Sequence, residues 1–252
     1  MIVTITNQKG GIGKSTTALN LGYGLRNKGY KVLLIDLDAQ ANLTSTTTAN
    51  EEHKNSYDLM TGKATVKQCI QPLDDNIDII TAVLDLATLD LELNKLGKEQ
   101  ILKEALEPIK ANYDFIIIDT PPSLGIATVN ALTTADRVLI PGQADKYSLE
   151  AVRSLYDKTI NVIRHYTNPG LIIDGILLTR YKARTNITKQ ITEIFSQEAE
   201  AMGTKLYNAK IREASAIGES QATRQDIFSY DGKSNVASDF KAFTDEFLEG
   251  IK

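Results

Sequence analysis

Short apolar runs alternate along the chain with longer stretches in which apolar residues are spaced three and four positions apart. The runs stand at residues 2–6, 31–36, 77–80, 113–119, 135–141 and 171–179. Such β-branched, apolar runs are typical of strands that are covered on both faces, and the helically spaced stretches between them predict helices. The alternation predicts an α/β fold, in which one doubly wound, mostly parallel sheet is flanked by helices.

The remaining segments are less regular. Residues 57–60 and 66–70 predict short helices within an otherwise polar, irregular stretch from 44 to 76. Leucines between 84 and 106 predict a long amphipathic helix, or a helix pair broken at Gly97. Residues 147–166 predict one helix, and the last helix carries Phe240, Phe243 and Phe247. Neither a repeat nor a Pro/Gly/Ser-rich linker divides the chain, so we expect one domain over residues 1–252.

The turn between the first strand and the first helix is rich in glycine. Its sequence is Lys9-Gly10-Gly11-Ile12-Gly13-Lys14-Ser15-Thr16. Glycines let backbone N–H groups converge on an anion, and the start of a helix adds free N–H groups and partial positive charge. Lys14 is placed to reach the β- and γ-phosphates of a nucleotide, and the Ser15 hydroxyl to bind Mg²⁺. This turn therefore predicts a phosphate-binding loop.

Acidic residues end two of the predicted strands. Asp36 and Asp38 follow the strand at 31–35, and Asp119 follows the strand at 115–118. Open α/β sheets bind ligands at the carboxyl ends of their strands, and an acid there can accept hydrogen bonds from water on Mg²⁺. We expect these carboxylates to lie near the phosphate loop.

Composition narrows the class of protein. The chain has 252 residues, 42% of them hydrophobic, and a net charge of −4, so any surface for nucleic acid must be local. A single cysteine, Cys69, excludes an internal disulfide and a cysteine-cluster metal site, and two histidines are too few for a usual zinc site. Neither a signal peptide nor a membrane-spanning window is visible, which favours a cytoplasmic protein.

Three segments resemble the ParA/Soj-type partition ATPases of the MinD/ParA class. In the phosphate loop, Gln8 replaces the first glycine of the pattern G-x-x-x-x-G-K-[ST], and Lys9 adds the second lysine of the deviant Walker A motif. Residues 36–42 resemble the D-x-D-P-Q-x-N stretch of this family, with Ala39 in place of proline. Residues 118–123 read I-D-T-P-P-S, which is characteristic of the same family.

The resemblance implies a role for each motif residue. ATP-binding positions are Lys9, Gly10, Gly11, Ile12, Gly13, Lys14, Ser15, Thr16 and Arg180. Magnesium-binding positions are Ser15, Asp36 and Asp119. Lys9 and Lys14 would offset charge on the phosphates, Lys9 typically across an ATP-sandwich dimer, and Asp38 would orient the attacking water.

Two further segments predict a local basic surface. Residues 179–186 resemble the T-M-Y-D-x-R-T-N stretch of the family, and residues 210–214 the segment before its E-A-x-x-x-G. Residues 180–224 hold eight basic and five acidic side chains, a net +3 against −7 elsewhere, which suits contacts with a phosphate backbone. The resemblance implies DNA binding by Arg180, Lys182, Arg184, Lys210 and Arg212. Alternatives remain: each residue alone suits a solvated surface, and Arg180, which replaces a methionine, could stack on the base.

Together these features imply a small ParA-type ATPase without an N-terminal helix-turn-helix. ATP and Mg²⁺ would join two subunits into a homodimer that binds nonspecific double-stranded DNA, and a ParB-like centromere-binding protein would stimulate hydrolysis. The implied location is cytoplasmic and nucleoid-associated, with no membrane contact.

Other classes share parts of this pattern. A MinD-like or protein-cargo positioning ATPase, acting on a membrane or another surface, has the same nucleotide motifs. A MinD-like protein should end in a basic amphipathic helix, whereas the last helix here is acidic. A P-loop metallochaperone or reductase would need paired cysteines. A binding module that has lost hydrolysis is a further alternative, although both Asp36 and Asp38 are present.

Overall fold

The computed structural model describes residues 1–182 and 186–251. Within them the sheet has seven strands in the order β3-β4-β2-β5-β1-β6-β7, and β3 is antiparallel to β4 while all other neighbours are parallel. The strands are β1 (Ile2–Ile5), β2 (Val32–Asp36), β3 (Gln71–Asp74), β4 (Ile77–Ile80), β5 (Phe115–Asp119), β6 (Arg137–Gly142) and β7 (Ile172–Leu178). The predicted doubly wound, mostly parallel sheet is confirmed.

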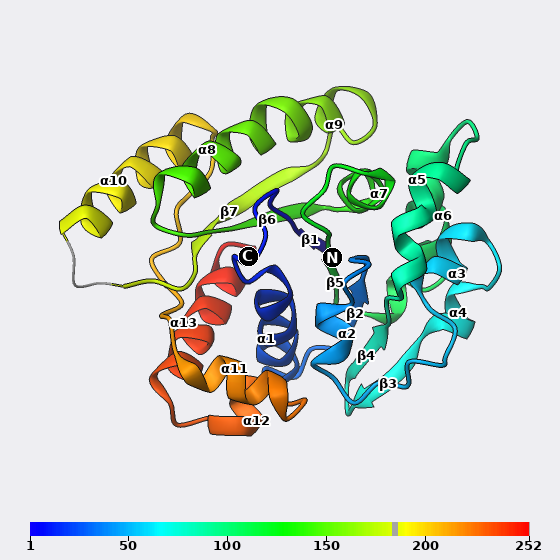
Figure 1. Ribbon diagram of the computed structural model, residues 1–252, viewed down its shortest axis with the longest axis horizontal. Helices are drawn as coiled ribbons and strands as arrows, with labels where there is room; N and C mark the ends of the chain where they lie inside the picture. Colours follow the sequence, from blue (N-terminus) through cyan, green and yellow to red (C-terminus); the bar gives the residue numbers. More distant parts are fainter. Residues whose placement is uncertain (183–185, 252) are drawn as a thin grey trace.

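Helices cover both faces of this sheet (Figure 1). One face packs against α1 (Lys14–Arg26), α11 (Ser215–Ala222), α12 (Ile227–Asp231) and α13 (Asn235–Glu249). The other packs against α3 (Ser56–Thr61), α4 (Val66–Cys69), α5 (Leu89–Glu92), α6 (Ile101–Leu106), α7 (Ile126–Thr134), α8 (Lys146–Leu155), α9 (Asn161–Tyr166) and α10 (Asn186–Ala201). The short α2 (Asn42–Ser45) follows the carboxyl end of β2.

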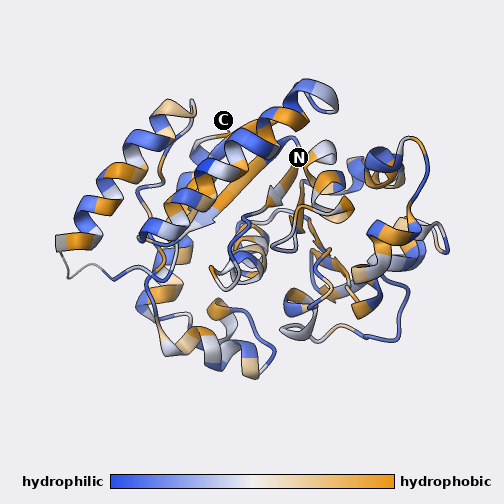
Figure 2. Cartoon of the chain, turned by 45° about the horizontal axis from the view of Figure 1, so that its top comes forward, coloured by the Kyte–Doolittle hydropathy of each residue, from blue (hydrophilic) through white to orange (hydrophobic). Residues whose placement is uncertain are grey.

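The central strands bury side chains on both faces because they lie between two helical layers. In β2, Val32 and Leu34 join the cluster under α1, whereas Leu33 and Ile35 join the cluster on the opposite face. Figure 2 shows the strands coloured as hydrophobic through the middle of the molecule. Continuous apolar runs, rather than alternating ones, are what a parallel sheet covered on both sides requires.

The leucine-rich stretch from 84 to 111 differs from the long helix that its spacing predicts. It forms short helical pieces: η1 (Leu84–Thr88), α5, η2 (Lys98–Gln100), α6 and η3 (Lys110–Asn112). Gly97 has a φ of 75° and therefore breaks the helix, as predicted, and Pro108 follows the end of α6. Only part of the leucine stripe reaches the core: Leu86, Leu89, Leu93, Leu102 and Leu106 are buried, whereas Leu84, Leu91 and Leu96 are exposed.

Two other regions refine the prediction. The stretch that is predicted to be irregular up to residue 76 contains β3, which turns back to β4 through Asn76 at a φ of 61° and carries Pro72 on the sheet edge. The helix predicted to reach residue 166 continues from α8 through a π-helical turn, η4 (Tyr156–Ile160), into α9. In the described ranges, every helix is too short or too polar to cross a bilayer.

The acidic last helix packs on the core, as its phenylalanines predict. Phe240, Phe243 and Phe247 of α13 are fully buried against α1 and β5. The two helices approach closely at Gly24 of α1, where a methyl group would collide with the Thr244 hydroxyl. This contact holds α13 against the C-terminal end of α1.

We therefore expect Gly24→Ala to destabilise the protein by about 1–3 kcal/mol, because the added methyl group overpacks this contact. Urea unfolding would measure the change, and Gly24→Ala/Thr244→Ala should recover part of it. Gly218→Ala is the matched control, since Gly218 lies in α11 and a methyl group there meets nothing within 4 Å. Equal stability of Gly24→Ala and Gly218→Ala would argue against the close contact.

Candidate nucleotide-binding site

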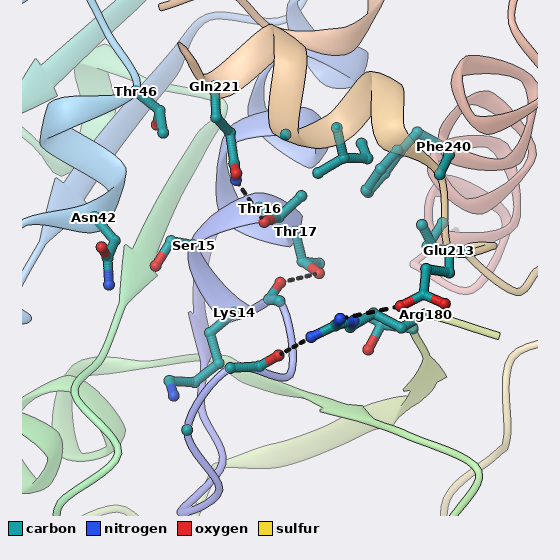
Figure 3. A pocket seen from close by; sticks show the side chains of 18 of the residues that line it. Lys14, Ser15, Thr16, Thr17, Asn42, Thr46, Arg180, Glu213, Gln221 and Phe240 are labelled. Carbon is teal, nitrogen blue, oxygen red and sulfur yellow. Dashed lines mark hydrogen bonds and ion pairs between the residues drawn. The ribbon is translucent and has the colours of Figure 1, made fainter.

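A cavity of about 890 Å³ opens at the carboxyl ends of the parallel strands. Of the predicted ATP-binding residues, it is lined by Gly10, Gly11, Gly13, Lys14, Ser15, Thr16 and Arg180. Figure 3 shows Asn42 and Thr46 on one side of this cavity and Glu213, Gln221 and Phe240 on the other. Its size is that of a site for a nucleotide-sized ligand.

The loop before α1 is held in an open, glycine-dependent conformation. Gly11 and Gly13 have φ values of 70° and 85°, which L-residues with a side chain rarely adopt. The Thr17 hydroxyl donates to the Gly13 carbonyl at 2.7 Å, and the Thr179 hydroxyl donates to the Ile12 carbonyl at 2.6 Å. These bonds hold the loop in place, and the first N–H groups of α1, which have no acceptor within the helix, are available to an anion in the cavity.

Lys14 places an ammonium group at the base of the cavity. The residue is only 7% exposed, and its ammonium donates a long hydrogen bond to the Lys9 carbonyl, 3.5 Å from Nζ. Burial lowers the pKa of Lys14, while the negative charges of Asp119 and Asp38 act in the opposite direction. Because its hydrogen bond to the Lys9 carbonyl is long, the Lys14 ammonium is also able to bind an anion that enters the cavity.

Asp119 lies at the end of β5, fully buried, with no hydrogen-bond partner for either carboxylate oxygen among the described residues. Burial and the nearby charge of Asp36 raise the pKa of Asp119 well above its usual range, and the charge of Lys14 only partly offsets them. An unpartnered buried carboxylate is costly, and a divalent cation or its bound water would satisfy it. This orphaned group fits the predicted Mg²⁺ site.

Asp36 is also fully buried, but its carboxylate is occupied by groups of the chain. Oδ1 accepts the Asp38 N–H at 3.0 Å, and Oδ2 accepts the N–H and the hydroxyl of Thr44 at 2.9 and 2.8 Å. Burial raises the pKa of Asp36 to about 6, and the three hydrogen bonds act against that shift. The predicted role of Asp36 near Mg²⁺ stays a prediction.

Asp38 lines the cavity beside Gln40, whose N–H donates to Asp38 Oδ1 at 3.0 Å. The residue is 6% exposed. It faces Lys14, whose pKa it influences. A carboxylate at this place can accept a hydrogen bond from a water molecule that attacks a phosphate, as predicted for it.

Lys9 and Ile12, by contrast, do not line the cavity. The Ile12 side chain is buried in the core. The Lys9 ammonium turns to the start of α8, where Nζ lies 2.7 Å from Asp145 Oδ2 and 3.3 Å from Gln143 Oε1. In the isolated chain, therefore, the second lysine of the loop pairs with Asp145.

The far side of the cavity contains residues that the sequence analysis did not assign. Gln221 of α11 donates to the Thr16 hydroxyl at 3.0 Å, and Ile211, Ile217 and Phe240 add apolar surface. The motif E-A-x-x-x-G at 213–218 was the available signal, since it lies in this wall. Thr179 was also missed, although its place at the end of a predicted strand pointed to the ligand-binding edge.

The predicted DNA-binding residues are mostly engaged within the chain. Arg180 Nη2 and Lys182 Nζ both pair with Glu213, at 3.0 and 2.6 Å, and Arg180 Nη1 lies 3.4 Å from the Gly11 carbonyl. Arg212 makes a two-pronged ion pair with Asp239. Lys210 lies over the Tyr181 ring and has no carboxylate partner among the described residues. Arg184 falls outside the described residues.

No three His, Cys, Asp or Glu side chains gather as a metal cluster in the parts of the chain that the structure describes. The carboxylates that line the cavity are Asp38 and Glu213, whereas the predicted magnesium-binding residues Asp36 and Asp119 are fully buried and are not part of its lining. Mg²⁺ in nucleotide sites takes few protein ligands, because phosphate oxygens and water supply the remainder.

Comparison with known proteins assigns the chain to a family. A family model described as an AAA domain matches residues 1–173. The sporulation initiation inhibitor protein Soj of Bacillus subtilis is 40% identical over 240 residues, which are 94% of this chain and 93% of Soj. The chain belongs to the ParA/Soj family.

Solved structures of similar proteins extend this ParA/Soj assignment to the fold. A plasmid partition protein of Borrelia burgdorferi, bound to AMPPNP, matches with a TM-score of 0.83 and 29% identity, over 98% of each chain. Cobyrinic acid a,c-diamide synthase of Mycobacterium smegmatis, with bound ADP and magnesium, matches with a TM-score of 0.84 and 28% identity, over 98% of this chain and 94% of the synthase.

The orphaned carboxylate of this ParA/Soj-family chain leads to a stability prediction. Because the folded pKa of Asp119 lies above its unfolded value, stability without ligand falls as the pH rises through the folded pKa. Asp119→Asn should lack this fall and gain at least about 1 kcal/mol in unfolding free energy at pH 8, measured in urea.

Asp75→Asn is the control, since Asp75 is exposed in the β3–β4 turn. It should leave the pH dependence unchanged. An Asp119→Asn protein that is no more stable than wild type at pH 8 would contradict the picture of an uncompensated buried carboxylate.

Proposed function

We propose that the protein is an Mg²⁺-dependent partition ATPase that binds ATP in the cavity at the start of α1. The observation that carries the proposal is the convergence of an unpartnered Asp119 carboxylate, a loosely held Lys14 ammonium and Asp38 at one glycine-rich loop. These groups are costly to bury without a ligand, and a magnesium–triphosphate would compensate each of them. The similarity to the plasmid partition protein of Borrelia burgdorferi over most of both chains supports the partition role.

Each residue of the site then has a defined task. Bound Mg²⁺–ATP supplies the phosphoryl group that is transferred to water. The first N–H groups of α1 and the Lys14 ammonium hold the phosphates and offset their charge. Ser15 and Asp119 hold the metal, Asp119 through water. Asp38 accepts a hydrogen bond from the attacking water and thereby orients it.

The mouth of the cavity suits a second subunit. Gly10 and Gly11 are exposed there, and a methyl group on either would meet nothing within 4 Å. In a homodimer formed face to face, Lys9 would exchange Asp145 for a phosphate of the facing subunit. Assembly would therefore depend on ATP, because the triphosphate supplies the negative charge that replaces Asp145.

We further propose that the ATP-bound homodimer binds double-stranded DNA without sequence preference. The surface would include Lys210, which has no carboxylate partner among the described residues, and the family resemblance adds Arg184 to it. Arg180 and Lys182 would contribute only after exchanging their ion pairs with Glu213, whereas Arg212 would stay paired with Asp239. A ParB-like partner bound to a centromere would stimulate hydrolysis and so release the DNA.

Asp38→Ala should bind ATP but hydrolyse it at least tenfold more slowly, because the attacking water loses its orienting group. The variant should remain a dimer with ATP and Mg²⁺ for far longer than wild type. Phosphate release and light scattering measure the two effects.

Lys14→Ala is the comparison variant and should lose nucleotide binding itself, as seen with a fluorescent ATP analogue. If Asp38→Ala hydrolyses ATP at the wild-type rate, the role given to Asp38 is wrong. If Lys14→Ala still binds and hydrolyses ATP normally, the phosphate-loop assignment is wrong.

DNA binding tests the partition role directly. Binding to duplexes of unrelated sequence should require ATP and Mg²⁺, be absent with ADP, and weaken steeply with salt. Lys210→Ala should weaken it several-fold and reduce the salt slope by about 1, as expected for one lost phosphate contact. Fluorescence anisotropy across a salt titration measures both quantities.

Arg212→Ala is the matched control on the same segment. Because Arg212 is paired with Asp239, this change should lower stability rather than DNA affinity. Equal losses of DNA affinity in Lys210→Ala and Arg212→Ala would contradict the view that only Lys210 contacts the DNA. If wild type binds no DNA with any nucleotide while ATP turnover persists, the partition role is wrong and a surface- or cargo-positioning role takes its place.

A further inference from the structure

The Thr44 side chain joins three segments around the nucleotide cavity. It lies in α2, is 2% exposed, and its hydroxyl donates to Asp36 Oδ2 at 2.8 Å. The hydroxyl oxygen of Thr44 in turn accepts the N–H of Ala82, just beyond the end of β4, at 2.9 Å. One hydroxyl thus ties α2 to the carboxyl ends of two neighbouring strands, β2 and β4.

Thr44 supplies most of the hydrogen bonds that the Asp36 carboxylate accepts. Two of its three donors come from Thr44, through the backbone N–H and the hydroxyl, and the third is the N–H of Asp38. Asp36 is therefore arranged as an anchor for the segment that follows it. Asp119, whose oxygens are unpartnered, is the carboxylate arranged for an outside ligand.

The anchored segment forms one wall of the cavity. Asp38, Gln40, Asn42, Ser45 and Thr46 all line it. The segment turns sharply at Ala41, whose φ of 51° is unfavourable for a residue with a side chain. A backbone in this conformation needs contacts that hold it, and the bonds of Thr44 to Asp36 come three residues after the turn.

We propose that Thr44 is a positioning residue for ATP hydrolysis: its hydroxyl fixes α2 to Asp36 and Ala82 and so sets the place of Asp38 in the cavity. Thr44 acts through Asp36 and does not touch the nucleotide. The inference rests on the proposed ATPase function and adds to it the residue that holds the water-orienting carboxylate in place. Small displacements of such a group lower the rate strongly, because the reaction needs near-ideal geometry.

Three variants test this role. Thr44→Val has nearly the same shape but lacks the hydroxyl, so one bond to Asp36 and the acceptor for the Ala82 N–H are lost. Thr44→Ser keeps the hydroxyl and should restore both. Thr81→Val is the matched control: Thr81 precedes Ala82, is fully buried, and its hydroxyl has no hydrogen-bond partner among the described residues.

The expected result is a split between rate and binding. Thr44→Val should lower kcat by about tenfold to a hundredfold. The Kd for a fluorescent ATP analogue should stay within about threefold, because the phosphate loop is unchanged. Thr44→Ser should return kcat to within about threefold of wild type, and Thr81→Val should leave both quantities unchanged. A Thr44→Val enzyme with wild-type kcat, or a Thr44→Ser enzyme as slow as Thr44→Val, would overturn the proposal.

Hydrogen exchange of the nucleotide-free protein tests the anchor without activity. In Thr44→Val the amides of Asp38, Thr44 and Ala82 should exchange faster than in wild type, and those of β5 should not change. If wild type shows no ATPase activity but exchange accelerates as expected, the anchor stands and the proposed function fails. If exchange at these amides is unaltered while wild type is active, the positioning role fails and the proposed function stands.

Discussion

The structure is organised by a conflict of charge at the carboxyl edge of the sheet. Three carboxylates, Asp36, Asp38 and Asp119, and the Lys14 ammonium are brought into one nearly dry place. Parallel strands force this meeting, because β2 and β5 pair in register so that Asp36 lies opposite Asp119. The chain resolves the conflict only in part: Asp36 is satisfied internally, and Asp119 is not. This difference separates Asp36, which shapes the site, from Asp119, which is available to a ligand.

Much of this arrangement follows from the sequence. Uninterrupted apolar runs between helical stretches are sufficient for a parallel sheet, and acids at the ends of two such runs must meet at its ligand-binding edge. The phosphate loop could be predicted equally well, because a glycine-rich turn between a strand and a helix is typical of phosphate binding. These features are local or follow from strand direction alone.

What the sequence did not predict depends on partners far apart in the chain. The hydroxyl of Thr179 is one among many in a Thr-rich protein, and only the fold places it 2.6 Å from the Ile12 carbonyl. The stretch from 84 to 111 has a clear leucine stripe, yet Gly97 and the crowded helical layer divide it into short turns. Charge counting gave a basic surface of +3, but it could not show that Glu213 and Asp239 hold three of the cations.

The short antiparallel strand at one end of the sheet has a consequence for solubility. β3 is an edge strand of four residues that runs antiparallel to β4. It carries Pro72, which has no N–H to donate to another strand. At the opposite end, isolated bridges from the segment around Leu206 and Arg212 run beside β7 and its continuation. Exposed edges of sheets invite pairing between molecules, which leads to aggregation. Because both sheet edges are protected, many copies can reach a high local concentration without pairing through their strands. Contacts between molecules are then made by other surfaces, which can dissociate.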